Sequence, residues 1–552
     1  MNEAATIERI VVCRATCWHS TSAPLLGVAL IIGAFAGLAL QNLQLPGLYN
    51  DEMIQVVPAL NVIHGGMPSP VSGTEISLFH HAVPIMTMDY IGSLKTLLFV
   101  PVVALAGVSP ESVRVTTLSI GATSLVVTFA FFRRMVPAPV ALLAAALLAT
   151  DLSFIYYVRV DYGPTALMML LKAVALWRLA AWWQEARVRD LAVGALALGL
   201  GVYNKVDFLW IVGALGGAVC LAAPRAARSR ITMPACCIGF ACFMLGTAPL
   251  TYFNLRSGMP TLAAALGPAT AGGPPGDFVE QLAGRIVDLG QLVDGYAVGI
   301  CDRCLESHGH NELALILIFS SALIAIAGMF PKLRGPHWRV SLFALIATAL
   351  VLAAAAATRG GYGGHHVILA YPFPQLLAAC GVYSVFQWLR PRLGSWITRT
   401  AAALVIGATL LQNLATANGY ISLLSSTGGT GNFSDAIYAL DSYLQRQDPS
   451  APVVDLDWGF YYPLVGLSQG SLHVVEPWNW YMAGSTAELK PFLADPSARY
   501  VAHVSSWANF PRGIERFTDA VAAAGLQAVL EEQFTMRDGA PVIDVYRVRE
   551  PL

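Results

Sequence analysis

The chain has 552 residues, of which 56% are hydrophobic and only 12% are charged, and its formal net charge at pH 7 is −1. Soluble domains carry about 25% charged residues, so this composition excludes an ordinary water-soluble protein. Apolar runs recur over the first three quarters of the chain, and several approach the roughly 20 residues that a helix needs to cross a bilayer. The sequence therefore predicts a polytopic integral membrane protein.

Eleven apolar runs are predicted to span the membrane and to form an all-α domain over residues 23–416. They lie at residues 23–41, 113–132, 137–150, 164–183, 191–204, 208–223, 231–253, 313–330, 340–357, 366–388 and 400–416. Residues 1–22 carry Arg9 and Arg14 and are predicted to form a cytoplasmic N-terminus. The first run is long enough to be a retained helix rather than part of a cleaved signal peptide.

The apolar run at residues 94–108 decides the predicted topology. If this run does not span, most Lys and Arg side chains of the connecting loops fall on the side of the N-terminus, as the positive-inside rule requires. If it spans, the excess of Lys and Arg falls on the side opposite to the N-terminus. We therefore predict an amphipathic or re-entrant piece that lies along the outer membrane surface. It belongs to an external loop at 42–112, and a second long external loop covers 254–312.

The tail, residues 417–552, is predicted to be a small α/β extracytoplasmic domain. Strand-like runs occur at Pro452–Leu456, Leu472–Val475, Tyr500–Val504 and Val542–Val548. Helical periodicity occurs at Asp435–Gln445 and Gly513–Ala524. Strands that alternate with helices over this length are typical of a compact α/β domain.

The first external loop holds an acidic pair soon after the first span. Asp51 and Glu52 precede a predicted amphipathic helix from Met53 to His64, where acidic side chains would in the simplest case complement the helix dipole. The same loop also contains other polar side chains, namely Glu75, His80, His81, Asp89 and Lys95.

Three later segments place charged side chains on the same outer face. A short loop contains Arg159 and Asp161, which either serve chemistry or form a structural ion pair. Lys205 lies in a polar hinge between two spans, and the alternative there is a plain interfacial turn. A glycine-rich loop, for which the alternative is simple flexibility, carries Arg359, His365 and His366.

This combination of side chains suits a reaction between an anionic lipid and a nucleophilic hydroxyl or amine. A carboxylate acts as the general base on the acceptor. Cations, or a metal ion, stabilise the departing phosphate. The order of these features resembles that of the GT-C superfamily of membrane glycosyltransferases, in particular the protein O-mannosyltransferase and aminoarabinose-transferase-like branch. The resemblance covers about residues 20–420 and is carried by Asp51-Glu52, the stretches Asp89–Lys95 and Ser112–Arg114, and the runs Arg159–Pro164 and Gly199–Lys205.

The resemblance implies a polyprenyl-phosphate-linked sugar donor, inversion at the anomeric carbon and an external cavity above the membrane. By position, Asp51 looks like the catalytic acidic residue that deprotonates the acceptor, with Glu52 beside it. Asp161, or alternatively Asp151, resembles the second acid of the branch. The candidates for binding the donor phosphate are Lys95, Arg159, Lys205 and Arg359. A divalent metal is a candidate cofactor, for which the candidate ligands are Glu75, His80, His81, His365 and His366.

The chain departs from the aminoarabinose-transferase pattern at Gly92–Lys95, where that pattern has a Lys-Pro-Pro-Leu-like segment. The acceptor therefore stays open among a lipid, a glycan and a protein. The expected partners are the polyprenyl-phosphate sugar donor, this unknown acceptor and the lipid bilayer, with no nucleic acid. The expected location is the inner (plasma) membrane of a bacterium, with the C-terminal domain periplasmic or extracellular.

Two other functions stand as alternatives. A transporter or flippase for a lipid-linked sugar would also need cations and an aqueous cavity, but transporters often show internal repeats and polar residues near the bilayer midplane. A non-catalytic membrane receptor would use the aromatic side chains of the tail to bind its partner, and these are Trp458, Tyr461, Tyr462, Trp478, Trp480 and Tyr481.

Overall fold

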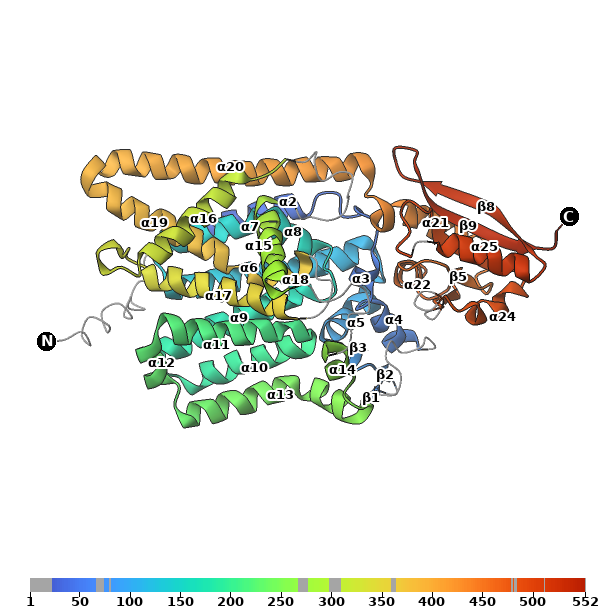
Figure 1. The fold of residues 1–552 in the computed structure, drawn as a ribbon, viewed down its shortest axis with the longest axis horizontal. Coiled ribbons are helices and arrows are strands. Elements are labelled where there is room, and N and C mark those ends of the chain that lie inside the picture. The colour runs from blue at the N-terminus through green and yellow to red at the C-terminus, as the bar shows by residue number, and fades with distance from the viewer. Residues whose placement is uncertain are drawn as a thin grey trace.

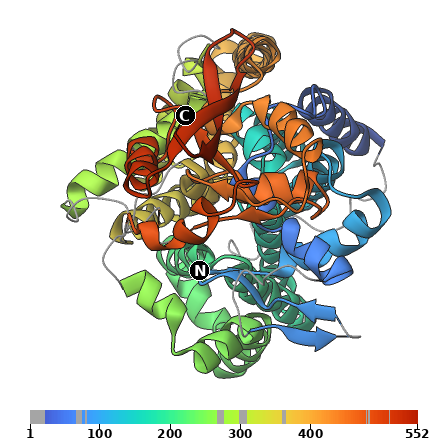
Figure 2. The ribbon, with the colours of Figure 1, turned by 90° about the vertical axis from the view of Figure 1, so that its right-hand side faces the viewer.

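The structure is a computed structural model, and it describes residues 22–551 except 66–73, 79–80, 267–276, 297–308, 359–363, 478–479, 481–483 and 511. A helical body, residues 22–427, extends along the long axis of the molecule. A C-terminal domain, residues 428–551, lies at one end of this body (Figure 1). Viewed from that end, the C-terminal domain covers part of the helical body (Figure 2).

Each of the eleven runs predicted to span falls on a helix. The helices of the body are α2 (Ser22–Ala39), α6 (Pro110–Met135), α7 (Ala138–Ala149), α8 (Leu152–Arg159), α9 (Thr165–Glu185), α10 (Val188–Asn204), α11 (Leu209–Ala222), α12 (Pro224–Arg230), α13 (Met233–Ser257), α16 (Glu312–Ala327), α17 (Trp338–Ala357), α19 (Phe373–Leu393) and α20 (Ser395–Thr427). Within the described residues, five helices are long and apolar enough to cross a membrane by themselves, or up to eight if each bent pair counts as one span.

Two of the bent pairs place polar residues where the chain breaks. Helices α7 and α8 meet at 60°. The break falls at Asp151, whose carboxylate accepts a hydrogen bond from the Phe154 N–H and so caps α8. The four-residue helix α18 (Gly364–Val367) and the 3-10 turn η4 (Ile368–Ala370) meet α19 at 46°. Interrupted helices are tolerated at membrane depth where their main-chain groups are satisfied inside the protein.

The external segments between α2 and α6 lie at the end of the body that faces the C-terminal domain (Figure 1). They comprise α3 (Asn50–Met53), α4 (Val57–His64), β1 (Ile76–Leu78), β2 (His81–Val83), β3 (Met86–Met88), β4 (Ile91–Gly92) and α5 (Leu94–Ala106). Two further external helices are α14 (Pro260–Leu266) and α15 (Phe278–Asp294). Helix α5 is the apolar run for which we predicted a surface position, and it packs against α4.

The C-terminal domain is built on a five-stranded sheet with the order β6-β5-β7-β9-β8. Its elements are α21 (Ala436–Gln445), β5 (Val453–Asp455), α22 (Tyr461–Leu467), β6 (Val474–Val475), α24 (Lys490–Leu493), β7 (Arg499–His503), α25 (Gly513–Ala523), β8 (Gln527–Thr535) and β9 (Pro541–Arg549). Strands β6, β5 and β7 are parallel, whereas β9 is antiparallel to β7 and β8. The four predicted strands and two predicted helices are present. Edge strand β8 was not predicted, because its polar residues break the apolar alternation.

One hydrophobic cluster joins the first external loop to the C-terminal domain. It contains Met53 on α3, Val57 on α4, Phe99 and Val103 on α5, and many side chains of the C-terminal domain, among them Leu464. The C-terminal domain therefore packs directly against the first external loop. Helix α20 also continues past the predicted end of its span to Thr427, because Ala417, Tyr420, Ile421 and Leu424 are buried against the body.

Candidate active site

Asp51 lies on the short helix α3, at the junction between the body and the C-terminal domain. Its backbone carbonyl accepts a hydrogen bond of 3.1 Å from the Gly163 N–H. This bond ties α3 to the loop between α8 and α9, which carries Asp161. The two acidic segments that the sequence singled out, more than a hundred residues apart, are therefore neighbours in space.

The Asp51 carboxylate is half-buried, and no described residue makes a hydrogen bond or ion pair with it. Burial raises the pKa of Asp51 to about 6, and the positive charges of Lys205 and Lys95 oppose this shift. A carboxylate with a pKa in this range is ionised near neutral pH and still basic enough to take a proton. Asp51 therefore has the properties of a general base.

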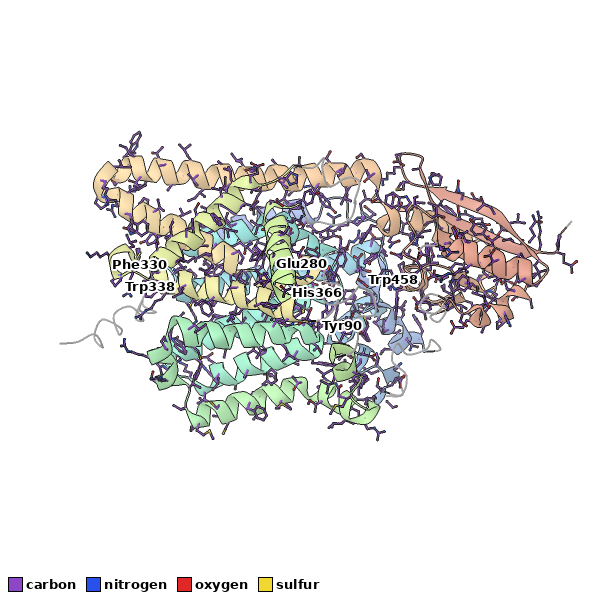
Figure 3. All side chains as sticks on the ribbon, viewed as in Figure 1. Tyr90, Glu280, Phe330, Trp338, His366 and Trp458 are labelled. Carbon is purple, nitrogen blue, oxygen red and sulfur yellow. The ribbon has the colours of Figure 1, made fainter. Side chains whose placement is uncertain are left out.

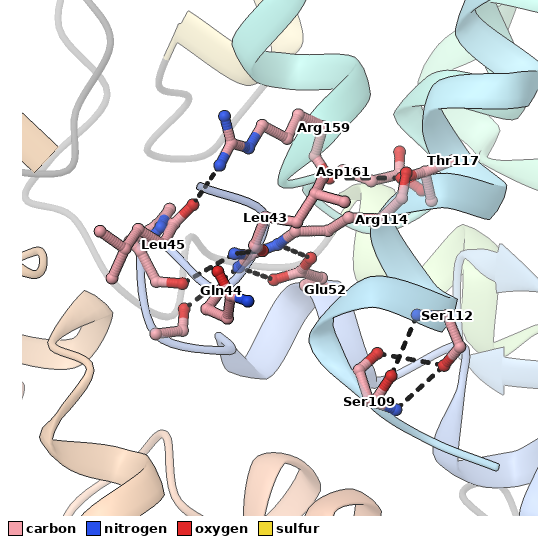
Figure 4. A network of polar contacts seen from close by, with 12 residues as sticks. Leu43, Gln44, Leu45, Glu52, Ser109, Ser112, Arg114, Thr117, Arg159 and Asp161 are labelled. Carbon is pink, nitrogen blue, oxygen red and sulfur yellow. Dashed lines mark hydrogen bonds and ion pairs between the residues drawn. The ribbon is translucent and has the colours of Figure 1, made fainter. Parts of the chain in front are cut away.

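Glu52 has a different environment, because it is fully buried and paired with Arg114 of α6. The Arg114 guanidinium donates from Nε to Oε1 at 2.8 Å and from Nη2 to Oε2 at 2.9 Å (Figure 4). Its Nη1 also donates to the carbonyls of Leu43 and Pro46. A bidentate pair of this kind is strong and geometrically specific. Glu52 therefore holds the start of the external loop onto α6.

The start of α6 explains how Arg114 is placed. Ser109 and Ser112 form a reciprocal capping box, in which each side chain accepts from the other residue's backbone N–H (Figure 4). Pro110 occupies the first turn, where its lack of an N–H costs nothing. Arg114 thus projects from a well-anchored helix terminus.

Asp161 and Lys95 form a buried ion pair, with 2.6 Å between Oδ2 and Nζ. Lys95 also donates to the Gly163 carbonyl, and Asp161 accepts from the Ala166 N–H at the start of α9. The backbone of Asp161 is left-handed, with φ of 52°. These bonds fix the loop that carries Tyr162, so we place Asp161 and Lys95 in positioning roles.

The structural Arg159–Asp161 pair that we considered from the sequence is not formed. Arg159 Nη2 instead donates to the carbonyls of Asn42 and Leu45, at 2.5 and 2.7 Å. The buried Arg159 Nε has no hydrogen-bond partner among the described residues. Arg159 Nε is therefore a buried donor that no described residue engages.

Lys205 follows α10 at the point where the helix ends and the 3-10 turn η2 (Val206–Phe208) begins. Its Nζ lies 3.4 Å from Asp207 Oδ2, which is also 2.9 Å from His366 Nδ1. A β-bridge between Ile91 and Lys205 and a hydrogen bond from the Val206 N–H to the Tyr90 carbonyl join this turn to the first external loop. The hinge therefore belongs to the site and is more than an interfacial turn.

An aromatic group forms around Tyr49, two residues before Asp51. The Tyr49 ring lies 4.2 Å from Phe433 and 5.7 Å from Trp458, both of which belong to the C-terminal domain. The Tyr162 ring lies 5.5 Å from Tyr49 and stacks on His365 at 5.2 Å. Figure 3 shows Trp458 at the junction of body and domain, whereas Phe330 and Trp338 lie near the opposite end.

The candidate metal ligands are not brought together among the described residues. Glu75 directly precedes β1, His81 is the first residue of β2, and His365 and His366 lie on α18. His80 and Arg359 lie outside the described residues. In the part of the chain that the structure describes, no three His, Cys, Asp or Glu side chains are placed to hold a metal ion.

Sequence reasoning gave no role to Arg114, Asp207, Tyr49 or Phe433. Arg114 and Asp207 carried a usable signal, since each is a charged residue at the end of a predicted apolar span, where an unpaired charge is costly. The aromatic contacts carried none, because nothing in the local sequence indicates which rings meet.

Comparisons with known proteins were made on both sequence and structure. A family model described as dolichyl-phosphate-mannose-protein mannosyltransferase matches residues 96–253, which include Arg114, Arg159, Asp161 and Lys205. No curated protein matches the sequence.

The fold is similar to that of ArnT from Cupriavidus metallidurans in the apo state, with a TM-score of 0.57 at 12% identity over 96% of this chain and 98% of that one. The same protein bound to undecaprenyl phosphate gives 0.56 at 12% identity over 94% and 97%. The oligosaccharyltransferase of Archaeoglobus fulgidus, in complex with Zn and sulfate, gives 0.53 at 13% identity over 88% and 70%. The chain is thus an integral membrane protein with the GT-C fold, and the predicted resemblance is confirmed.

Proposed function

We propose that this chain is an inverting glycosyltransferase that moves a sugar from a polyprenyl-phosphate donor to an acceptor at the end of the body covered by the C-terminal domain. The observation that carries the proposal is the environment of Asp51. Among the four carboxylates gathered at this site, Glu52, Asp161 and Asp207 each have a cationic partner within 4 Å, whereas no described residue engages Asp51. A free carboxylate next to bound ones is the group able to accept a proton.

The reaction is a single displacement. The acceptor oxygen attacks the anomeric carbon, and its proton passes to Asp51. The bond between that carbon and the phosphate oxygen breaks, and the electron pair leaves with the polyprenyl phosphate. Lys205 Nζ and Arg159 Nε stand as the cationic groups for the departing phosphate, because their existing contacts leave donors available.

A lipid-linked donor is supported from outside this chain as well. The matching family model is described by a dolichyl-phosphate sugar, and the similar ArnT structure holds undecaprenyl phosphate. The donor lipid would lie in the bilayer beside the helical body, with its phosphate at the level of Lys205. We place the protein in the inner membrane of a bacterium, with its N-terminus in the cytoplasm and its C-terminal domain in the periplasm.

The test is a transfer assay on the full chain in nanodiscs. A panel of labelled undecaprenyl-phosphate sugars serves as the donor, and a membrane extract serves as the acceptor. We expect donor-dependent release of undecaprenyl phosphate, and a drop of about 10²- to 10⁴-fold in Asp51→Asn, the usual contribution of a general base.

The matched control is Glu111→Gln, an exposed acid on the first turn of α6, which should transfer at the wild-type rate. Wild-type turnover by Asp51→Asn with an unchanged melting temperature would show that Asp51 is not the base. Passage of the lipid across the bilayer without release of undecaprenyl phosphate would support the transporter instead.

A further inference from the structure

Trp458 follows β5, an inner strand of the sheet in the C-terminal domain. Strands β6, β5 and β7 are neighbours and parallel, so their carboxyl ends meet at one edge of the sheet. Trp458 comes three residues after Asp455, the last residue of β5. In open α/β sheets, ligands bind outside the carboxyl ends of the strands.

A network of hydrogen bonds around the buried Asp457 holds the turn that carries Trp458. The Asp457 carboxylate accepts from the backbone N–H groups of Asn509 and Phe510, each at 3.1 Å, and lies 2.7 Å from His503 Nδ1. Asn509 Nδ2 then donates to the Trp458 carbonyl at 2.8 Å. The next loop along the sheet edge therefore braces the main chain of Trp458. Side chains that are fixed by a supporting set of hydrogen bonds are pre-organised for binding.

The Trp458 ring is only half-buried although its backbone is held rigidly. It reaches across the junction to Tyr49, two residues before the proposed base, with an edge-to-face contact at 5.7 Å. Phe433 and Tyr162, also half-buried, complete the group, since their ring centroids are 6.0 Å apart and both lie within 5.5 Å of Tyr49. Burial and the nearby Asp51 charge raise the pKa of Tyr49, which places its hydroxyl in the field of that carboxylate.

The chemistry of this group selects one class of ligand. The flat face of an indole is apolar and electron-rich, and it matches the C–H face of a pyranose ring, whose hydroxyl groups point to the sides. A peptide that bound by strand addition would need a free sheet edge, where backbone groups are unpaired. Trp458 lies beyond the carboxyl ends of the strands and not along the side of an outermost strand.

We propose that Trp458, in edge-to-face contact with Tyr49, is a subsite for a sugar ring of the acceptor, so that the acceptor is a glycan or glycolipid. The inference rests on the proposed function, and it gives the C-terminal domain a direct part in choosing the acceptor. Lys205 and Arg159 approach the reaction from the helical body, where the donor lipid lies. Trp458 belongs to the C-terminal domain, and a sugar ring of the acceptor would reach it at the junction of body and domain (Figure 3).

The first experiment measures binding and does not depend on catalysis. Methyl α-pyranosides of mannose, glucose and galactose are added to the full chain in nanodiscs, and saturation-transfer NMR detects ring protons in contact with the protein. We expect signals from ring C–H protons with wild type and with Trp458→Phe. We expect these signals to be lost in Trp458→Leu, which keeps an apolar side chain but no aromatic face.

The control is Trp396→Leu, because Trp396 is 76% exposed at the start of α20 and lies away from the site. Equal signals in Trp458→Leu and wild type would overturn the proposal, as would the absence of a signal from every pyranoside. A signal from a serine-containing peptide in place of the sugars would assign the subsite to a protein acceptor. A Phe433→Leu variant repeats the test if Trp458→Leu does not fold.

The second experiment uses the transfer assay with the same variants. Trp458→Leu should lower transfer to the acceptor at least tenfold, while slow hydrolysis of the donor by water is retained. Equal loss of transfer and hydrolysis would make Trp458 a structural residue. If wild type released no undecaprenyl phosphate at all, the proposed function would fail, whereas the pyranoside binding would still decide the nature of the subsite.

Discussion

At the scale of single residues, the four carboxylates at the site have the same chemistry but differ in their partners. Glu52 is engaged by Arg114, Asp161 by Lys95, and Asp207 by Lys205 and His366. Each of these contacts occupies the carboxylate with a cationic partner. Asp51 differs because no described residue makes a hydrogen bond or ion pair with its carboxylate, and Lys205 and Lys95 act on it through their charges.

The protonation of Asp51 should set the acid limb of the pH–rate profile. With a pKa of about 6, raised by burial and held down by Lys205 and Lys95, the base is lost as the pH falls below 6. We expect kcat/KM for transfer to fall tenfold per pH unit there. Because Lys205 lowers this pKa, Lys205→Met should raise it and move the limb to higher pH.

Lys490→Met, an exposed lysine of the C-terminal domain, is the control, and it should leave the limb in place. An acid limb that stayed at the same pH in Lys205→Met would mean that a group other than Asp51 controls it. The shift separates an electrostatic effect on the base from a simple loss of phosphate binding, because the latter lowers the rate without moving the limb.

Removing Arg114 should destabilise the protein strongly. Both members of the Glu52–Arg114 pair are fully buried, so Arg114→Met leaves an uncompensated carboxylate. We expect a loss of about 3–5 kcal/mol, measured by unfolding in detergent, and partial recovery in the double variant Glu52→Leu/Arg114→Met. The exposed Arg512–Glu515 pair is the control, since Arg512→Met should change stability by less than about 1 kcal/mol. Similar losses for the two pairs would refute the structural role of Glu52.

At the scale of elements, the breaks in the helices create the site. Lys205 and Asp207 lie where α10 stops and η2 begins, and His366 lies in α18 just before the bend into α19. In a continuous helix, the backbone groups would be hydrogen-bonded within the helix, and these side chains would be spread around its surface. The interruptions instead bring three charged or titratable side chains to one level next to α3.

Helix α5 connects the first external loop to the C-terminal domain through the hydrophobic cluster that they share. Phe99 is fully buried in the shared cluster, whereas Leu105 of the same helix is 89% exposed. We expect Phe99→Ala to cost about 3–5 kcal/mol, because it leaves a cavity in that cluster. It should also speed proteolysis at the start of the C-terminal domain. Leu105→Ala is the matched control, and equal protease sensitivity in the two variants would mean that α5 does not secure the domain.

At the scale of the whole molecule, the basic loops and the C-terminal domain lie at opposite ends. Helix α12, with Arg225, Arg228 and Arg230, and the turn between α19 and α20 are both remote from the C-terminal domain (Figure 1). Since basic loops stay in the cytoplasm, this arrangement predicts an external C-terminal domain.

The orientation can be measured with fusions to the C-terminus of the full chain in bacterial cells. Alkaline phosphatase, which is active only outside the cytoplasm, should be active there, and green fluorescent protein exported in unfolded form should be dark. A fluorescent and phosphatase-inactive pair of fusions would reverse the proposed orientation. It would also move the Asp51 site to the cytoplasmic face.

The sequence by itself determined the elements of this protein. Apolar runs of nearly bilayer length predict helices wherever they occur, since backbone groups in lipid must be satisfied within the segment. The strands of the tail were visible in their short apolar runs, and the charged loops stood out because charges are rare in this chain. The choice of Asp51 stays a prediction that rests on the resemblance carried by the order of the polar segments.

The tertiary structure decided which of these residues are free to react. Arg114 and Glu52 are 62 residues apart in sequence, and Lys95 and the Gly163 carbonyl are 68 apart. Neither local periodicity nor composition indicates such pairings. In the folded chain, Lys95 is paired with Asp161 and Glu52 with Arg114, and the Trp458 ring contacts Tyr49. The physical reason is that a buried charge must find a counter-charge or hydrogen bonds, and only the packing of distant segments decides where it finds them.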